Sequence, residues 1–253
     1  MTLLFIIFAS LASGVIALLA ALALLKGRLW SVERSHAFLS FAAGTLLAVA
    51  FLDLMPEAIE RLGEIRGGDV IETALLFILL GFLLFFAIEK FILWHHCHEE
   101  RCEVRASASI VLIGDTLHNF LDGIAIAVAF LVSPAIGLAT TVAIFAHEIP
   151  QEVADFSILL SSGMKKSRAL RYNMFSSLAS LVGAVAAYFF ATAIDSAIPF
   201  LIALTAGGFT YIAAADLIPE IHKEERRTHM VFQFLLFFVG ILFIFILTSL
   251  FAH

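Results

Sequence analysis

Long apolar segments separated by short polar ones run through the whole chain. Most of them exceed the roughly 20 residues that an α-helix needs to cross the hydrocarbon layer of a membrane. We predict eight spans, at residues 2–25, 35–56, 72–94, 106–131, 135–162, 168–193, 197–218 and 230–252. The fourth and fifth are joined only by a short turn at Val132-Ser133-Pro134. The pattern therefore predicts an all-α protein with one polytopic membrane domain over residues 1–253.

Composition agrees with a membrane protein. Of the 253 residues, 62% are hydrophobic and 14% are charged, whereas about 25% are charged in a soluble domain. This argues against a soluble all-α protein, and we expect no nucleic-acid partner. The first charged side chain is Lys26. Because a signal peptide would start with basic residues, we expect residues 2–25 to be a retained span.

The basic residues give the spans an orientation. Thirteen of the 15 Lys and Arg residues fall in or beside alternate loops, on one side of the predicted membrane. The other side holds only Arg61 and Arg66, in a loop that also carries four acids. The positive-inside rule places the thirteen in the cytoplasm, so both termini are expected outside.

The chain contains an internal repeat. AGTLLAVAFLDLMPE (Ala43–Glu57) and AGGFTYIAAADLIPE (Ala206–Glu220) match at seven positions with a constant offset of 163 residues. The two copies lie in spans of opposite direction, so the repeat is inverted. Inverted repeats are typical of secondary transporters. They predict a 3+2+3 arrangement, in which spans 4 and 5 form the central pair.

The central pair carries polar residues that are costly inside a membrane. On span 4 they are Asp115, His118, Asn119 and Asp122, and on span 5 they are His147, Glu148, Gln151, Glu152 and Asp155. A helical wheel places the first set within about 100° and the second within about 140°. We expect the two stripes to face each other, with Asp115, Glu152 and Asp155 either binding the ion or lining its path.

Neither stripe has a Lys or Arg to neutralise its acids. Protons could do so, but a divalent cation does it better, and ligands of this kind suit zinc, iron(II) or manganese(II). Pro150 also frees the carbonyl of Ala146, so we expect a kink that turns this carbonyl toward the cavity.

Two further sets of residues have less specific patterns. Asp53 and Asp216, with Glu57 and Glu220, lie near span ends, where they either solvate the helix end or line the metal pathway. The segment 95–105 is predicted to be a cytoplasmic loop; it carries His95, His96, Cys97, His98 and Cys102. Such a cluster can bind metal, or the loop can simply be polar.

The motifs HNFLDG (His118–Gly123) and HEIPQEVAD (His147–Asp155) resemble those of the ZIP (Zrt/Irt-like) divalent metal transporters. The second is similar to the HE-x-P-H-E-x-G-D signature of one subgroup. The resemblance implies import of zinc, or of iron, manganese or cadmium, into the cytosol. It also implies an elevator-type movement, a homodimer and a place in the plasma membrane. The residues that it assigns to the metal are His118, Asn119, Asp122, His147, Glu148 and Gln151.

The sequence departs from the subgroup signature at two positions. Gln151 stands in place of the second His and Ala154 in place of Gly. Ser180 lies about where some relatives have a Glu that completes a second metal site, so we expect one principal site. Gln151 is a weaker zinc ligand than His, which makes a broader metal range an alternative.

Other functions fit the sequence less well. An intramembrane metalloprotease needs HExxH on an unbroken helix; the second His is absent and Pro150 interrupts the helix. A carrier of anions is disfavoured, because the carboxylates would repel them. A metal channel of the same fold remains open. We therefore predict a transporter, not an enzyme, with no cofactor other than the transported ion.

Overall fold

The computed structural model describes residues 1–26, 32–65, 69–94, 104–161, 163–193, 195–222 and 226–251. No strand occurs among them, which confirms the predicted all-α fold. The elements are α1 (Thr2–Leu11), η1 (Ala12–Ile16), α2 (Ala17–Lys26), α3 (Val32–Ala48), η2 (Val49–Leu54), α4 (Met55–Ile65), α5 (Val70–Trp94), α6 (Val104–Val132), α7 (Pro134–Ser161), α8 (Lys166–Ser177), α9 (Ala179–Ala193), η3 (Asp195–Ala197), α10 (Ile198–Tyr211), η4 (Ile212–Leu217), α11 (Ile218–Ile221) and α12 (Arg227–Phe251).

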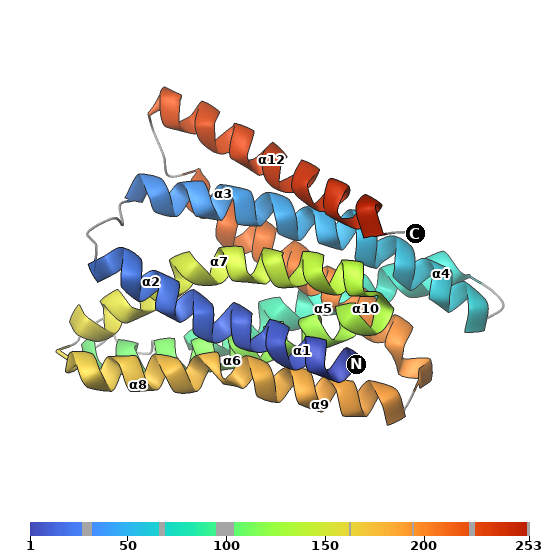
Figure 1. Cartoon of the computed structure of the whole chain (residues 1–253), viewed down its shortest axis with the longest axis horizontal. Helices are drawn as coiled ribbons and strands as arrows, with labels where there is room; N and C mark the ends of the chain where they lie inside the picture. The colour runs from blue at the N-terminus through green and yellow to red at the C-terminus, as the bar shows by residue number, and fades with distance from the viewer. Residues whose placement is uncertain are drawn as a thin grey trace.

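Several of these elements join into longer helices. Residues 2–26, 32–65 and 198–221 each form one continuous helix with a π-helical segment inside it. Among the described residues, seven helices are long and apolar enough to cross a membrane. The helix α7 is not one of them, because its second half carries the polar stripe. It lies in the middle of the bundle in Figure 1, where α2, α3 and α6 pack against it.

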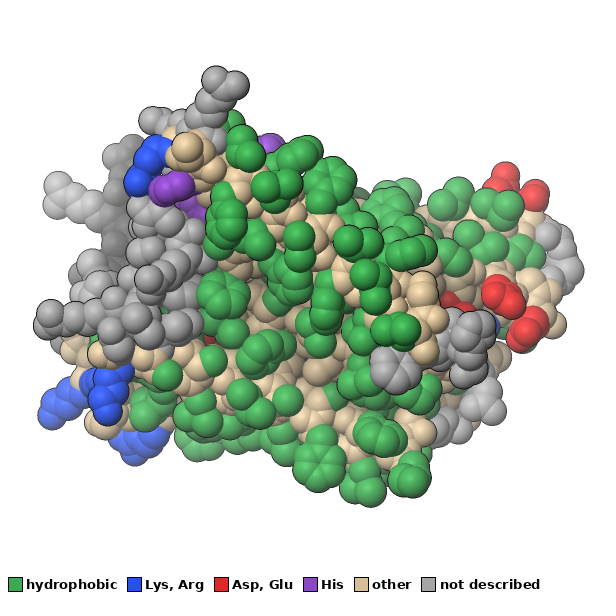
Figure 2. Space-filling model, turned by 45° about the horizontal axis from the view of Figure 1, so that its top comes forward, with side chains coloured by type: hydrophobic (Ala, Val, Ile, Leu, Met, Phe, Trp, Pro, Cys, Tyr) green, Lys and Arg blue, Asp and Glu red, His purple; other side chains and the backbone are tan. Residues whose placement is uncertain are grey.

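The two ends of the bundle differ in charge. Both chain termini lie toward the same end, which is also the end reached by α4 (Figure 1). On the face drawn in Figure 2, acidic side chains gather at that end and basic ones at the opposite end, with a broad apolar surface between them. The predicted orientation, with the basic end in the cytoplasm, depends on this separation of basic from acidic residues.

The internal repeat recurs in the backbone. The π-helical segment η4 begins and ends 163 residues after η2, the offset of the sequence repeat. Each segment lies just before a proline, Pro56 or Pro219. Proline lacks an N–H and clashes with the carbonyl four residues earlier, and the wider π turn relieves this conflict. The helix therefore continues beyond Pro56 to Ile65, past the predicted end of the second span.

Side-chain packing repeats in the same way. Gly44 of α3 lies so close to α12 that a Cβ there would collide with the carbonyl oxygen of Phe237. Gly207 of α10, the matching residue, lies equally close to the Ile78 carbonyl oxygen of α5. In each half, a glycine thus allows a helix to pack directly against the backbone of its neighbour. This supports the predicted inverted arrangement.

The helices fall into two groups by their contacts. In one group, α6 packs against α7, α8 and α9, and α2 packs against α7. In the other, α3 packs against α12, and α10 packs against α4 and α5. The two groups also touch each other, because α7 packs against α3 and α12, and α6 packs against α10 and α5. The polar stripes of α6 and α7 therefore belong to the first group and lie next to the second.

Candidate metal site

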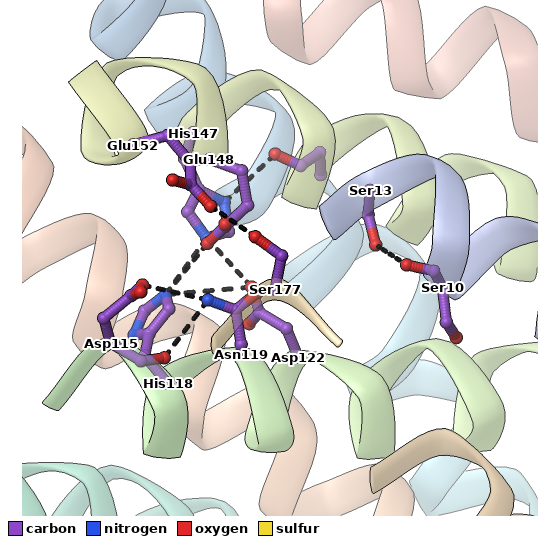
Figure 3. Close-up of polar contacts among 11 residues, drawn as sticks. Ser10, Ser13, Asp115, His118, Asn119, Asp122, His147, Glu148, Glu152 and Ser177 are labelled. Atoms are coloured by element: carbon purple, nitrogen blue, oxygen red, sulfur yellow. Dashed lines mark hydrogen bonds and ion pairs between the residues drawn. The ribbon is translucent and has the colours of Figure 1, made fainter. Parts of the chain in front are cut away.

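Four side chains of α6 and α7 converge in the centre of the bundle (Figure 3). They are His118, Asp122, His147 and Glu148, and one ligand atom from each lies within 4.8 Å of all the others. The helix α6 places His118 and Asp122 on one face, one turn apart, because they are four residues apart. The antiparallel α7 brings His147 and Glu148 against that face. We call these four residues the His/carboxylate cluster.

The distances within this cluster are short. The two imidazole Nε2 atoms are 3.2 Å apart. His147 Nε2 lies 3.3 Å from Asp122 Oδ2 and 3.8 Å from Glu148 Oε1. The side chains of Asp122, His147 and Glu148 are 1–2% exposed, whereas that of His118 is 19% exposed. His118 is therefore the member through which solvent reaches the cluster.

The carboxylates of the cluster lack the hydrogen bonds that buried acids normally have. Among the described residues, none donates a hydrogen bond to either oxygen of Asp122 or of Glu148. An ionised carboxylate buried without such bonds costs several kcal/mol. The only ion-pair partners that the described residues offer to these acids are the two imidazoles. A cation among the four side chains would neutralise both acids.

A backbone contact orients His147 toward this position. Its Nδ1 lies 3.2 Å from the carbonyl oxygen of Ala143, which can only accept a hydrogen bond. Nδ1 therefore carries the proton in the neutral ring, and Nε2 presents a lone pair to Asp122 and His118. Lone pairs and carboxylate oxygens at this distance repel one another unless a cation lies between them. Metal-binding histidines typically donate such a hydrogen bond from the ring nitrogen that does not face the metal.

Two other residues of the stripes, Asn119 and Glu152, have hydrogen-bond partners outside the cluster. Asn119 donates from Nδ2 to Oδ1 and to the backbone oxygen of Asp115, at 2.9 and 3.1 Å. Glu152 is fully buried and accepts hydrogen bonds from Asn173 at 3.1 Å and from Ser177 at 2.7 Å. Both of its oxygens are thus used in holding α7 to α8, and Figure 3 shows it turned toward Ser177.

Asn173 and Ser177 were not anticipated from the sequence. Their spacing of four residues on α8 places both on the face toward α7, and this was the available signal. Ser180, at the position where the sequence predicts no second metal site, is also buried, and its hydroxyl has no hydrogen-bond partner in the described part of the chain.

A cavity of about 380 Å³ leads to the cluster from the end of the bundle that carries the basic residues. His118 lies at its inner limit. The other polar residues along its wall are Gln151, Asp155, Tyr211 and Asp216. It contains the predicted ligand Gln151 and two of the predicted pathway residues.

The other predicted residues lie away from the cluster. Asp53 is half-buried, and its Oδ2 has no hydrogen-bond partner among the described residues. Glu57 is ion-paired with Arg61, one turn further along α4. Glu220 lies 4.0 Å from His36 Nε2. The loop residues His95, His96, Cys97, His98 and Cys102 fall outside the described residues.

Pro150 lies inside α7, and the helix continues through it to Ser161. The carbonyl of Ala146 loses its usual partner because proline has no N–H. The predicted kink and the part played by this carbonyl stay predictions.

The fold and the cluster together define an integral membrane protein with a buried ligand set of two imidazoles and two carboxylates. The model of the family described as ZIP zinc transporter matches residues 1–101 and 94–248. The chain belongs to this family. It is therefore a transporter and not an enzyme, and the metalloprotease alternative is set aside.

Individual relatives agree with this assignment. Zinc transporter ZIP13 of Mus musculus is 34% identical over 87% of this chain and 71% of its own length. The Pongo abelii protein of the same name is 36% identical over 85% of this chain and 66% of its own length. Zinc transporter ZIP6 of Homo sapiens is 36% identical over 62% of this chain. The alignment spans only 23% of the length of ZIP6.

Proposed function

We propose that this protein carries divalent transition-metal ions, zinc foremost, through the membrane into the cytoplasm. The proposal rests on the His/carboxylate cluster, whose buried carboxylates face two imidazoles and accept no hydrogen bond from the described part of the chain. Two nitrogen and two oxygen ligands suit the four-coordinate geometry of zinc. The relatives named as zinc transporters support this choice of substrate.

The path in this proposal runs along the axis of the bundle. A hydrated ion enters at the acidic end, near Asp53, and exchanges its water for the cluster. It leaves through the cavity lined by Asp155 and Asp216, toward the basic end. The orientation with both termini outside is part of the proposal, and the separation of charge in Figure 2 supports it.

An elevator-type movement is supported by the grouping of the helices. All four cluster residues lie on α6 and α7, within one packed group. A shift of that group against the other would therefore move the whole ligand set without taking it apart. The exposure of His118 alone, on the side of the cavity, favours a carrier that opens toward one side at a time over a channel.

The proposal also covers the metals that are carried and the oligomeric state. Gln151, in the exit cavity, adds a neutral oxygen near the path and supports a broader range that includes iron(II), manganese(II) and cadmium as the alternative to zinc alone. The plasma membrane and a homodimer are proposed from the family resemblance.

Uptake into liposomes tests the function. Radioactive zinc should accumulate in vesicles that contain the protein and saturate with concentration. His147→Ala and Asp122→Ala should each reduce uptake to near background, while Ser249→Ala, a polar-to-apolar change far along α12, should leave it unchanged. Normal uptake by both cluster variants would refute the proposal. A competition series with iron(II), manganese(II) and cadmium ranks the metals.

A further inference from the structure

A second cavity, of about 390 Å³, opens between α3, α11 and α12. Its lining is largely aromatic and aliphatic and includes Phe234, Phe237 and Ile221. Phe234 is 63% exposed, so the cavity opens on the apolar surface that the bundle presents to the membrane. It shares no lining residue with the cavity that leads to the His/carboxylate cluster.

Three polar side chains belong to the lining of this apolar space: Ser40, His222 and Gln233. Gln233 of α12 lines the cavity and is only 3% exposed. Among the described residues, its Nε2 has no hydrogen-bond acceptor. An amide donor buried without an acceptor costs about 1–3 kcal/mol. If the amide turns toward the cavity, an occupant that brings an oxygen acceptor would remove this cost.

The position of Gln233 identifies the kind of acceptor. It lies seven residues after Arg226, the exposed basic residue just before α12. Seven residues correspond to about 10 Å along the helix. This places the amide near the border of the head-group layer and the hydrocarbon, where phospholipids carry their phosphate and ester oxygens. The aromatic walls deeper in the cavity match an acyl chain.

We propose that this cavity is a binding site for one membrane phospholipid. A phosphate or ester oxygen of the lipid accepts the hydrogen bond of Gln233, and an acyl chain lies against Phe234 and Phe237. Ile218 and Ile221 of α11 form another wall. Since α11 continues directly from η4, which carries Asp216 of the exit cavity, a bound lipid braces the segment beside the metal path.

Native mass spectrometry of the detergent-purified protein, titrated with phosphatidylglycerol, tests the proposal. The wild-type chain should retain one lipid per chain. Gln233→Leu keeps the volume but removes the donor, and it should weaken binding about fivefold, the effect of one neutral hydrogen bond. Ile221→Trp fills the cavity and should abolish the retained lipid. Ser249→Ala should bind as wild type does.

Circular dichroism and size-exclusion chromatography establish that each variant is folded. Equal lipid retention by the wild type and both cavity variants would overturn the proposal. So would a wild-type chain that retains no lipid, or a dimer in which a second copy of the chain covers Gln233. Loss of retention in only the two cavity variants supports it.

Discussion

The change Asp122→Asn tests the His/carboxylate cluster with the least disturbance. It preserves the size of the side chain and removes one negative charge. Both carboxylate oxygens are buried without hydrogen bonds among the described residues, and Oδ2 lies 3.3 Å from His147 Nε2. The substitution therefore breaks no hydrogen bond that the described residues make to this side chain. Its main effect should fall on the bound cation.

The magnitude follows from the separation of the charges. All four ligand atoms lie within 4.8 Å of one another, so an ion among them is closer than that to Asp122. Two unit charges 4 Å apart attract by about 4 kcal/mol at an effective dielectric constant of 20, so a divalent ion and one carboxylate attract by about 8 kcal/mol. Desolvation offsets part of this attraction. We expect a net loss of about 3 kcal/mol, or roughly 100-fold weaker zinc binding.

Thermodynamic linkage makes the same change visible in stability. At a zinc concentration 100 times its dissociation constant, the wild type should be stabilised by about 2.7 kcal/mol. At that zinc concentration a variant that binds 100-fold more weakly should be stabilised by only about 0.4 kcal/mol. Without zinc, Asp122→Asn should equal or exceed the wild type in stability, because it removes an uncompensated buried charge.

Isothermal titration of the detergent-purified protein and thermal unfolding with and without zinc measure both effects. Ser249→Ala, at the far end of α12, is the control. If Asp122→Asn binds zinc as tightly as the wild type, the assignment of Asp122 as a ligand is wrong. If it destabilises the zinc-free protein by more than about 1 kcal/mol, Asp122 makes a structural hydrogen bond that the account does not include.

Three other substitutions have distinct expected outcomes. Glu152→Gln should lower the stability of the zinc-free protein by about 1–3 kcal/mol, because an amide cannot accept both hydrogen bonds from α8. Its zinc affinity should stay within twofold of that of the wild type. A larger loss of affinity would make Glu152 part of the ligand set. Gly207→Val should prevent α10 from packing on α5, since the added side chain meets backbone that cannot move aside. The yield of folded variant in size-exclusion chromatography should fall sharply. A yield equal to that of the wild type would contradict the close packing. Gln151→His should raise the preference for zinc over manganese(II) in liposome uptake by about tenfold, because imidazole favours the softer ion; an unchanged ratio would exclude Gln151 from the metal path.

Much of the fold could be predicted because the membrane constrains it strongly. Apolar length predicts a helix in each of the eight segments, since backbone groups in lipid must be paired within the helix. The repeat at Ala43–Glu57 and Ala206–Glu220 predicted equivalence of the two halves. It could not predict the π-helical form of η2 and η4, because the sequence marks only the proline and not the manner in which the preceding turn adapts to it.

The candidate site was predictable in part. The helical period placed His118 and Asp122 on one face, and His147 and Glu148 close together on another. It could not say which members of each stripe meet, because this depends on the rotation of α6 against α7. Glu152 illustrates the limit: it belongs to the same stripe as Glu148, yet it points to Asn173 and Ser177 on a third helix. Those partners become visible only when α8 is in place.

X-ray absorption at the zinc edge, on protein loaded with one zinc ion per chain, tests the central claim most directly. Zinc held by the His/carboxylate cluster should show a first shell of nitrogen and oxygen only, at about 2.0–2.2 Å, with the outer-shell scattering of two imidazole rings. His147→Ala should remove one ring from that signal. A sulfur ligand at about 2.3 Å, or a shell without imidazole, would contradict the assignment of the His/carboxylate cluster as the metal site.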